Sequence, residues 1–143
     1  MLDTCSEKLA ARSLRQTDTR LVLLDILHKA TGPLAPPEIV SLCHKAGRKA
    51  NKTTVYRDLA TMEASGIVRK VIVSDRKQYF ELTERGHHHH LICMACERIQ
   101  DIDLEEGVVL KRAAEISQKV GFAISSHAVE FYGHCASCLA VTA

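Results

Sequence analysis

The sequence predicts an α+β protein in which an N-terminal winged helix-turn-helix domain, residues 1–83, precedes a small α/β domain, residues 84–143. Helical patterns fill the first 66 residues and two strand-like segments follow them. The remainder has a β-β-α-β order and contains two Cys-x-x-Cys pairs. A length of 143 residues allows two small domains, and 46% hydrophobic with 25% charged residues is typical of a folded chain.

Two helices are expected before residue 50. The first begins at Thr17 or Asp18, since either side chain can cap a helix, and it runs to about residue 29. The second begins at the Pro36-Pro37 pair, because proline lacks only an N–H that is unpaired in a first turn, and Gly47 ends it. Its expected buried face consists of Ile39, Leu42 and Cys43.

A third helix is expected from about Lys52 to Ala64, with Gly66 ending it. It carries two stripes at helical spacing. One stripe is apolar and consists of Val55, Leu59 and Met62. The other consists of Thr53, Tyr56, Arg57 and Ala60. One face can therefore pack while the other meets a partner through a phenol and a guanidinium.

A hairpin is expected to follow, with strands over Ile67–Ser74 and Lys77–Leu82 joined through Asp75-Arg76. Three helices and a hairpin form a winged helix-turn-helix, whose third helix is the natural reader of the major groove. The DNA-contacting residues expected here are Lys52, Thr53, Tyr56, Arg57 and, at the hairpin tip, Arg76 and Lys77. The alternative is a helical or protein-binding domain in which these are ordinary surface residues.

The charge distribution agrees with a polyanionic partner for the first domain. The net charge is +2, but residues 1–82 carry 14 Lys/Arg against 9 Asp/Glu, and residues 83–143 carry 5 against 8. Aromatic residues make up 4% and Trp is absent, which argues against a stacking surface for single strands. No apolar run approaches the ~18 residues of a membrane span, and no signal-peptide pattern is present, so we expect a cytoplasmic protein without membrane contact.

The second domain is expected to contain strands over His90–Cys93 and Arg98–Ile102, a helix over Leu104–Val120 and a strand over Phe122–Tyr132. Gly121 ends the helix. The apolar stripe of that helix consists of Val109, Ala113, Ile116 and Val120. A unit of about 55 residues buries little surface, so a structural metal or a second copy of the chain is needed to stabilise it.

The cysteine pairs indicate such a metal. Two Cys-x-x-Cys pairs in a reducing compartment complete a tetrahedral S₄ set, which suits Zn²⁺ and leaves no open position. The four ligands would be Cys93, Cys96, Cys135 and Cys138. A redox dithiol is the alternative, and the absence of a thioredoxin-like helix after either pair disfavours it.

Four consecutive histidines lead into the second domain. Side chains alternate in an extended segment, so His88 and His90 would point one way and His87 and His89 the other. Such an arrangement allows two separate metal sites with two imidazoles each, and Glu81 and Asp101 are the nearest carboxylates. Imidazole with carboxylate suits Fe²⁺, Mn²⁺ or Zn²⁺, and an ion held by both Glu81 and Asp101 would couple the two halves. A solvated histidine run or an expression tag is the alternative.

These features together resemble the ferric uptake regulator (Fur) superfamily. The resemblance rests on Thr54-Val-Tyr-Arg-Asp-Leu, Phe80-Glu-Leu-Thr, the His-His-His-His-Leu-Ile-Cys-Met-Ala-Cys run and Gly133-His-Cys-Ala-Ser-Cys, and covers roughly residues 8–138. It implies a winged helix and an α/β dimerisation domain. It also implies a metal-dependent repressor that binds AT-rich palindromic double-stranded DNA as a homodimer.

The resemblance also implies residue roles. Arg15 would enter the minor groove, and Tyr56 and Arg57 would contact bases. The structural zinc set would be the four cysteines above, the regulatory set Glu81, His88, His90 and Asp101, and a further set His87, His89 and His127. Members of the family often take one more regulatory histidine from a linker between helices. Here that linker is Thr31-Gly-Pro-Leu34, which has no histidine, so His28 is a possible substitute. In the family, the further set usually includes a glutamate of the dimerisation helix. Alignment back from Gly121 places Leu110 at that position, so either Glu105 or Glu106 could supply the carboxylate here.

An iron-uptake regulator is the first choice, because Phe80-Glu-Leu-Thr followed by histidines looks most like that branch. A zinc-uptake regulator follows, favoured by the compact Cys-Ala-Ser-Cys ending, and a peroxide sensor is third, since it prefers aspartate at position 81. Fe²⁺ or Zn²⁺ is therefore the expected regulatory ion, with Mn²⁺ possible. A metal buffer and a metallohydrolase are rivals, but we expect no enzyme, since no partnered nucleophile, H-E-x-x-H motif or phosphate loop is present.

Overall fold

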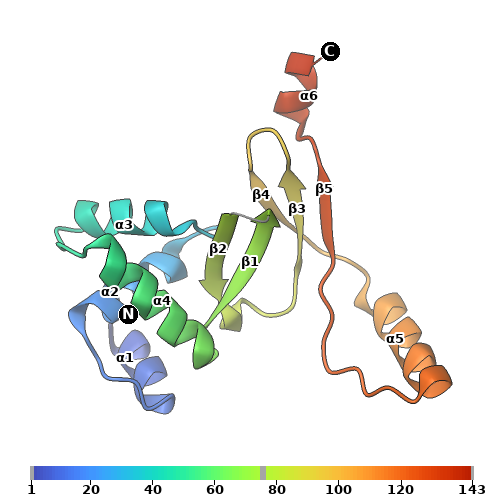
Figure 1. Cartoon of the computed structure of the whole chain (residues 1–143), viewed down its shortest axis with the longest axis horizontal. Coiled ribbons are helices and arrows are strands. Elements are labelled where there is room, and N and C mark those ends of the chain that lie inside the picture. The colour runs from blue at the N-terminus through green and yellow to red at the C-terminus, as the bar shows by residue number, and fades with distance from the viewer. Residues whose placement is uncertain (1, 75–76, 143) are drawn as a thin grey trace. The chain divides into compact units, whose positions relative to one another are not determined.

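The computed structural model describes residues 2–74 and 77–142 of the chain. The chain divides into two compact units, of which the first ends at Gly86 and the second begins at His87 (Figure 1). Each unit is an assembly of helices and a small sheet, in agreement with the α+β class. Among the described helices, none is both long and apolar enough to cross a membrane.

The first unit consists of helices and a two-stranded wing. Its elements are α1 (Leu2–Ala11), α2 (Asp18–Lys29), α3 (Pro36–Lys45), α4 (Lys52–Ala64), β1 (Val68–Ser74) and β2 (Lys77–Leu82), followed by a 3₁₀ turn over Thr83–Arg85. The expectation of three helices was incomplete, because α1 precedes them. Among the side chains of residues 4–11 of α1, only Cys5 and Leu9 are buried, and this short apolar stripe with no proline before it is a weak sequence signal.

Side-chain caps fix where these helices begin. The hydroxyl of Thr17 accepts a hydrogen bond from the Arg20 amide at 3.3 Å, as the sequence suggested. The carboxamide oxygen of Asn51 accepts one from the Thr54 amide at 2.8 Å and starts α4. Gly66 ends that helix region with a φ of +77°, which glycine adopts without a side-chain clash. Polar caps and glycine therefore determine where α4 lies along the chain.

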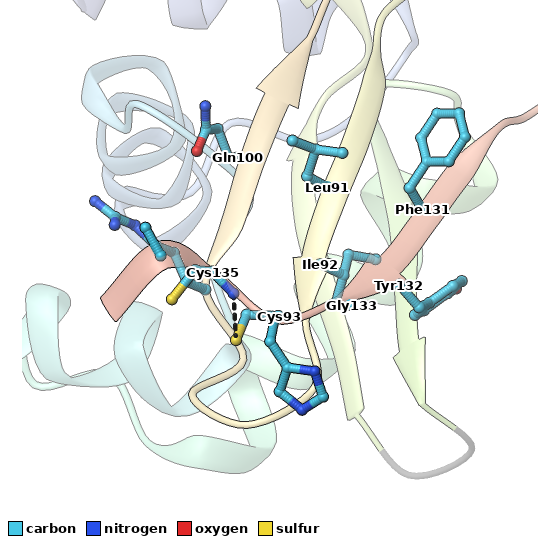
Figure 2. A pocket seen from close by; sticks show the side chains of 11 residues that line it. Leu91, Ile92, Cys93, Gln100, Phe131, Tyr132, Gly133 and Cys135 are labelled. Atoms are coloured by element: carbon cyan, nitrogen blue, oxygen red, sulfur yellow. Dashed lines mark hydrogen bonds between the residues drawn. The ribbon is translucent and has the colours of Figure 1, made fainter. Parts of the chain in front are cut away.

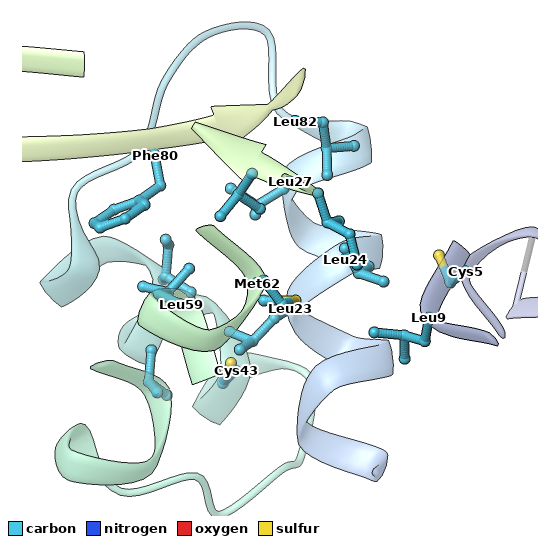
Figure 3. Close-up of a cluster of buried hydrophobic side chains, with 14 of the residues drawn as sticks. Cys5, Leu9, Leu23, Leu24, Leu27, Cys43, Leu59, Met62, Phe80 and Leu82 are labelled. Atoms are coloured by element: carbon cyan, nitrogen blue, oxygen red, sulfur yellow. The ribbon is translucent and has the colours of Figure 1, made fainter. Parts of the chain in front are cut away.

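A continuous apolar cluster holds α1 to α4 and the wing together (Figure 3). The apolar stripe of α4 is buried in it, and so are Ile39 and Cys43 of α3, whereas Leu42 is only half-buried. The stripe residues Val55, Leu59 and Met62 are each at most 1% exposed. Burial of one α4 face leaves the opposite face at the surface of this unit.

The wing is an antiparallel hairpin in which Val68 pairs with Leu82 and Lys70 with Phe80. Phe80 also exchanges two backbone hydrogen bonds with Leu34, at 2.8 and 2.9 Å, which fastens β2 to the segment before α3. The strand bounds agree with the expected hairpin. Its turn, Asp75-Arg76, lies outside the described residues.

The second unit has a three-stranded sheet with the order β4-β3-β5. β3 (His89–Cys93) pairs antiparallel with β4 (Ile99–Ile102) and parallel with β5 (Glu130–Gly133). The helices are α5 (Glu106–Val120) and α6 (Ala136–Thr142). The long strand expected over Phe122–Tyr132 is wrong for residues 122–129, because the ladder between β3 and β5 includes only residues 130–133 of this part of the chain. Helix α6 was not anticipated.

Helix α5 ends as expected at Gly121, which adopts the left-handed conformation with φ 71°. Its apolar stripe is present but is not covered by the described chain, since none of its residues is buried. Ile116 is 48% and Val120 67% exposed. The exposed apolar side chains of α5 and the segments after it include Val108, Leu110, Ile116, Val120, Phe122, Ile124, Phe131 and Tyr132.

Candidate functional site

The structure brings the four cysteines of the two Cys-x-x-Cys pairs together in the second unit. Their sulfur atoms all lie within 4.8 Å of one another. The parallel ladder explains this, because Cys93 at the end of β3 pairs with Gly133 at the end of β5. Cys135 follows two residues later, and its amide donates to the Cys93 sulfur at 3.3 Å (Figure 2). Four converging sulfurs without an open position fit a structural zinc ion.

Proton affinities differ within the cysteine set. Amide hydrogen bonds from Cys96 and then Cys135 lower the pKa of Cys93 to about 5, so this thiol is a thiolate at neutral pH. Cys138 is at the other extreme, because its hydrogen bond to Cys135 raises its pKa to about 12. The first ligand is thus already deprotonated, while the last must lose its proton when the set binds a metal.

Two of the four consecutive histidines form one ligand set with Asp101. The Nε2 atoms of His88 and His90 lie 3.1 Å apart, and each is 3.7 Å from Oδ1 of Asp101. The register of the sheet explains this, because His90 pairs directly with Asp101 across β3 and β4. Tetrahedral ligands at 2.0–2.1 Å from one ion are about 3.3 Å apart. The spacing of these three donor atoms therefore suits a shared divalent ion.

Glu81 was expected as the fourth member of this set. It is on β2 of the first unit, and its carboxylate is 1% exposed. Within that unit it accepts a hydrogen bond from Nε of Arg69 at 2.7 Å and one from Nη1 of Arg85 at 2.9 Å. Arg85 also donates to the Thr31 carbonyl at 3.2 Å. Two guanidinium groups thus neutralise the buried carboxylate. Its membership in the regulatory set stays a prediction.

The other two histidines of the run belong to a second ligand set. Nε2 of His87 lies 3.0 Å from Nε2 of His127 and 3.1 Å from Oε1 of Glu106. Nε2 of His127 lies 3.1 Å from Oε2 of the same carboxylate, and His89 is hydrogen-bonded to it. The four donor atoms all lie within 4.8 Å of one another. The hydrogen bond with His89 lowers the pKa of Glu106.

A second contact orients His89. Its Nδ1 donates to the Val129 carbonyl at 3.2 Å, which holds the ring with Nε2 directed at Glu106 and the rest of the ligand set. His89 is 1% exposed, so its ring is fixed by packing as well. A ring nitrogen bonded to a backbone carbonyl is typical of metal-ligating histidines, and three imidazoles with one carboxylate fit Zn²⁺, Fe²⁺ or Mn²⁺.

The choice between Glu105 and Glu106 is resolved by where α5 begins. Glu106 is its first residue and faces the histidines, whereas Glu105 precedes the helix. The suggested substitute His28 does not join any of the clusters formed by the described residues. Its Nδ1 lies 3.7 Å from Glu84 of the first unit. The sequence could have identified Glu106 only if the first residue of α5 had been predicted correctly.

The exposed face of α4 carries the residues expected to contact DNA. Thr53, Tyr56 and Arg57 are exposed, opposite the buried stripe. The ammonium of Lys52 lies 5.6 Å from the centre of the Tyr56 ring. Arg15 in the linker between α1 and α2 and Lys77 at the start of β2 are also exposed. Arg76 lies outside the described residues. Each described member is thus exposed at the surface of the first unit, and its role in binding DNA stays a prediction.

Comparisons with known proteins agree with these features. The model of the ferric uptake regulator family matches residues 11–132. Over 124 residues the chain is 32% identical to the ferric uptake regulation protein of Escherichia coli strain K12. The match covers 86% of this chain and 82% of that protein.

Two solved structures have a similar fold. The ferric uptake regulator of Vibrio cholerae matches with a TM-score of 0.79 at 28% identity, covering 90% of this chain and 98% of that one. A zinc uptake regulator complexed with zinc and DNA matches with a TM-score of 0.64 at 27% identity, covering 99% and 94%. The similarity thus extends over both units.

Proposed function

The chain belongs to the ferric uptake regulator family, and from this membership we propose that it is an iron-responsive repressor that binds palindromic operator DNA as a homodimer. Members of the family are metal-responsive, dimeric DNA-binding regulators of transcription and not enzymes. The proposal divides the roles: residues 1–83 bind DNA, and residues 84–143 bind metal and a second copy.

One observation carries the proposal: the histidine run at the start of the second unit is sorted into two ligand sets. His88, His90 and Asp101 are the residues that would hold the regulatory ion, with Glu81 as the ligand from the first unit. The bound ion would supply a positive charge shared by ligands from both units. His90 and Asp101 are adjacent across the sheet, so they hold their donor atoms in place before the ion arrives.

The DNA contacts follow from the exposed face of α4. Tyr56 and Arg57 would read base edges in the major groove, and Arg15 would enter the minor groove. Lys52, Thr53, Arg76 and Lys77 would contact the backbone. Two copies related by a two-fold axis present two such helices, so the operator is expected to be a palindrome with half-sites spaced by about one helical turn or a multiple of it.

The homodimer would form through α5 and the sheet of the second unit. The apolar side chains of α5 are exposed, and a groove of about 400 Å³ runs along the sheet beside Leu91, Phe131 and Gln100 (Figure 2). An exposed apolar area of this kind on a small unit is typical of an interface. A second copy is the occupant that the family implies.

A zinc-uptake regulator is the second candidate. The similarity to a zinc uptake regulator bound to zinc and DNA favours it, and so does the short Cys-Ala-Ser-Cys ending. Ligand chemistry restricts the ion without selecting it, because imidazole and carboxylate bind Fe²⁺, Mn²⁺ and Zn²⁺ alike. A peroxide sensor is disfavoured by glutamate at position 81.

Operator binding titrated against metal tests the proposal. Duplexes selected from a random library by the metal-loaded protein serve as probe, and the protein carries zinc in its cysteine set. Fe²⁺ added without oxygen should tighten binding about tenfold or more, which is a coupling of ~1.4 kcal/mol. His88→Ala should abolish this response, and the matched variant His28→Ala should keep it. Activation by a second equivalent of Zn²⁺ but not by Fe²⁺ would identify a zinc sensor, and equal affinity in all states would refute metal control.

A further inference from the structure

Arg20, in the first turn of α2, joins two parts of the first unit that are distant in sequence. Its Nε donates to Oδ1 of Asp58 on α4 at 3.0 Å. Its Nη1 donates to the backbone oxygen of Arg15 at 2.9 Å. The side chains of Arg20 and Asp58 are 16% and 10% exposed, so the pair is largely shielded from water. A single guanidinium therefore connects the linker before α2 to α4.

The position of Asp58 on α4 makes this contact unusual. It lies next to Leu59 on the buried side of the helix, whereas Tyr56 and Arg57 are exposed. A shielded carboxylate must be paired, and Arg20 provides the charge-assisted partner. The pair adds a directional contact to an otherwise apolar helix face. It fixes the rotation and the height of α4 on α2 in a way that non-directional packing does not.

At its other end, Arg20 holds the main chain of Arg15 and leaves the Arg15 side chain exposed. Other hydrogen bonds hold the same linker to α1. The Leu14 amide donates to the Leu9 carbonyl at 2.9 Å, and the carboxamide of Gln16 donates to the Ser6 carbonyl at 3.4 Å. Those contacts fasten the linker to α1. Thr17, the last residue of the linker, is hydrogen-bonded to α2 by the amides of Arg20 and Leu21. Of the hydrogen bonds described for residues 12–16, the one from the Arg20 side chain leads to α2 and, through Asp58, to α4.

We propose that Arg20 is a positioning residue for DNA recognition: it sets the main chain that bears Arg15 and the helix that bears Tyr56 and Arg57 in one fixed relative geometry. This rests on the proposed function, because those three residues are its predicted DNA contacts. The minor-groove and major-groove contacts then reach the duplex as one preformed unit. Little ordering of the linker is left to occur on binding, and this preorganisation favours affinity.

The planar guanidinium is essential to this role. Nε and Nη1 are part of one rigid fork and reach Asp58 and the Arg15 carbonyl together. An ammonium at the end of a flexible stem is a single point charge without this fixed geometry. Arg20→Lys should therefore keep the charge of the pair and lose the link.

The first test uses the free protein and does not depend on DNA. Replacing only one partner would leave a buried charge and could unfold the unit, so Arg20→Met and Asp58→Leu are combined to restore an apolar contact. Hydrogen exchange of the amides in residues 12–17 should be about tenfold faster in this variant, while the amides of α3 keep their protection. The matched control is Asp25→Leu with Lys29→Met, which removes an exposed ion pair from the same helix. Unchanged exchange in residues 12–17 would overturn the proposal.

The second test measures DNA binding by the metal-loaded protein, with duplexes selected by the wild type. The Arg20→Met/Asp58→Leu variant should bind about tenfold more weakly, or ~1.4 kcal/mol, with unchanged metal content, and the control should bind as the wild type does. Adding Arg15→Ala should reduce the DNA affinity of that variant far less than it reduces the DNA affinity of the wild type, because Arg15 is already misplaced in the variant and contributes little to binding. Fully additive losses would overturn positioning. A wild type without sequence preference would refute the proposed function, while the exchange experiment would still decide whether Arg20 holds the linker.

Discussion

The first unit buries a continuous apolar cluster from α1 to the wing, whereas the second unit buries histidine and cysteine side chains together with Ile92. Helix α4 illustrates the first pattern and α5 the second. Both helices carry an apolar stripe, but that of α4 is at most 1% exposed and α5 has no buried residue. The same helical pattern therefore has two meanings. In the first unit it marks a core, and in the second unit it marks a surface that needs a partner.

This contrast suggests that the two units are stabilised by different kinds of contact. The first has enough apolar burial to hold its own helices. The second contains the cysteine set, the set of His87, His89, Glu106 and His127 and the group of His88, His90 and Asp101, with little apolar core among its described residues. Its stability should depend on bound ions and on a second copy. Each of the following changes tests one side of the comparison, in order of decreasing expected effect.

Removing a cysteine ligand should have the largest effect. Structural zinc sites contribute roughly 10–16 kcal/mol of apparent binding free energy, and loss of one of four ligands forfeits much of it. Cys96→Ser should therefore purify with less than one equivalent of zinc and with a disordered second unit, as measured by elemental analysis and NMR. The matched variant Cys43→Ala, at a buried thiol of the first unit, should keep its zinc. Full zinc content in Cys96→Ser would contradict the assignment.

Truncating the core of the first unit should have the next largest effect. Leu59 is 1% exposed in the apolar cluster, so Leu59→Ala should lower the free energy of unfolding by about 2–5 kcal/mol. Denaturant melts of the zinc-loaded protein measure this loss. Zinc content should be unchanged, since the ligands belong to the other unit. A loss of less than 1 kcal/mol would mean that the cluster does not stabilise the unit as described.

A charge on the apolar stripe of α5 should break the dimer. Ile116 is 48% exposed and lies on the face expected to meet a second copy. Ile116→Asp should weaken self-association about 100-fold, or ~2.7 kcal/mol, as measured by sedimentation equilibrium. Lys111→Asp, also on α5 but outside the stripe, is the control and should stay dimeric. Two variants with equal association would place the interface elsewhere.

The base-reading face should give the smallest of these effects in free energy. Arg57→Ala should cost about 1–3 kcal/mol of operator binding and relax the preference at the bases it contacts. Lys77→Ala should weaken binding to every sequence alike and reduce the salt slope by about 1, because Lys77 is proposed to contact phosphate. Fluorescence anisotropy on selected and scrambled duplexes separates the two. If Arg57→Ala lowered the affinity for selected and scrambled duplexes equally, Arg57 would not contact bases.

Local signals predicted most of the first unit. The caps, prolines and glycines gave the bounds of α2, α3 and α4 and of the wing strands, because each fixes backbone geometry within a few residues. Helix α1 was missed, since few of its side chains enter the core. The pair of Arg20 with Asp58 could not be seen, because it joins residues 38 positions apart and each is an ordinary charged residue in the sequence.

The second unit was harder to predict because non-local pairing determines it. The sequence shows a long strand-like segment before residue 133, but β5 is only as long as its parallel ladder with β3. The alternation of the histidines was readable, since a strand places neighbours on opposite sides. The carboxylate of the further set was not, because Glu105 and Glu106 differ only in where α5 begins.

Hydrogen exchange followed by NMR before and after removal of zinc by a chelator tests the comparison most directly. The account predicts that amides of β3, β4 and β5 lose their protection when the ion is removed, while amides of α2, α3 and α4 keep theirs. Reloading with Zn²⁺ should restore the first group. If the amides of both units keep their protection, the second unit holds itself without ions, and the contrast between an apolar core and a ligand-held sheet is wrong.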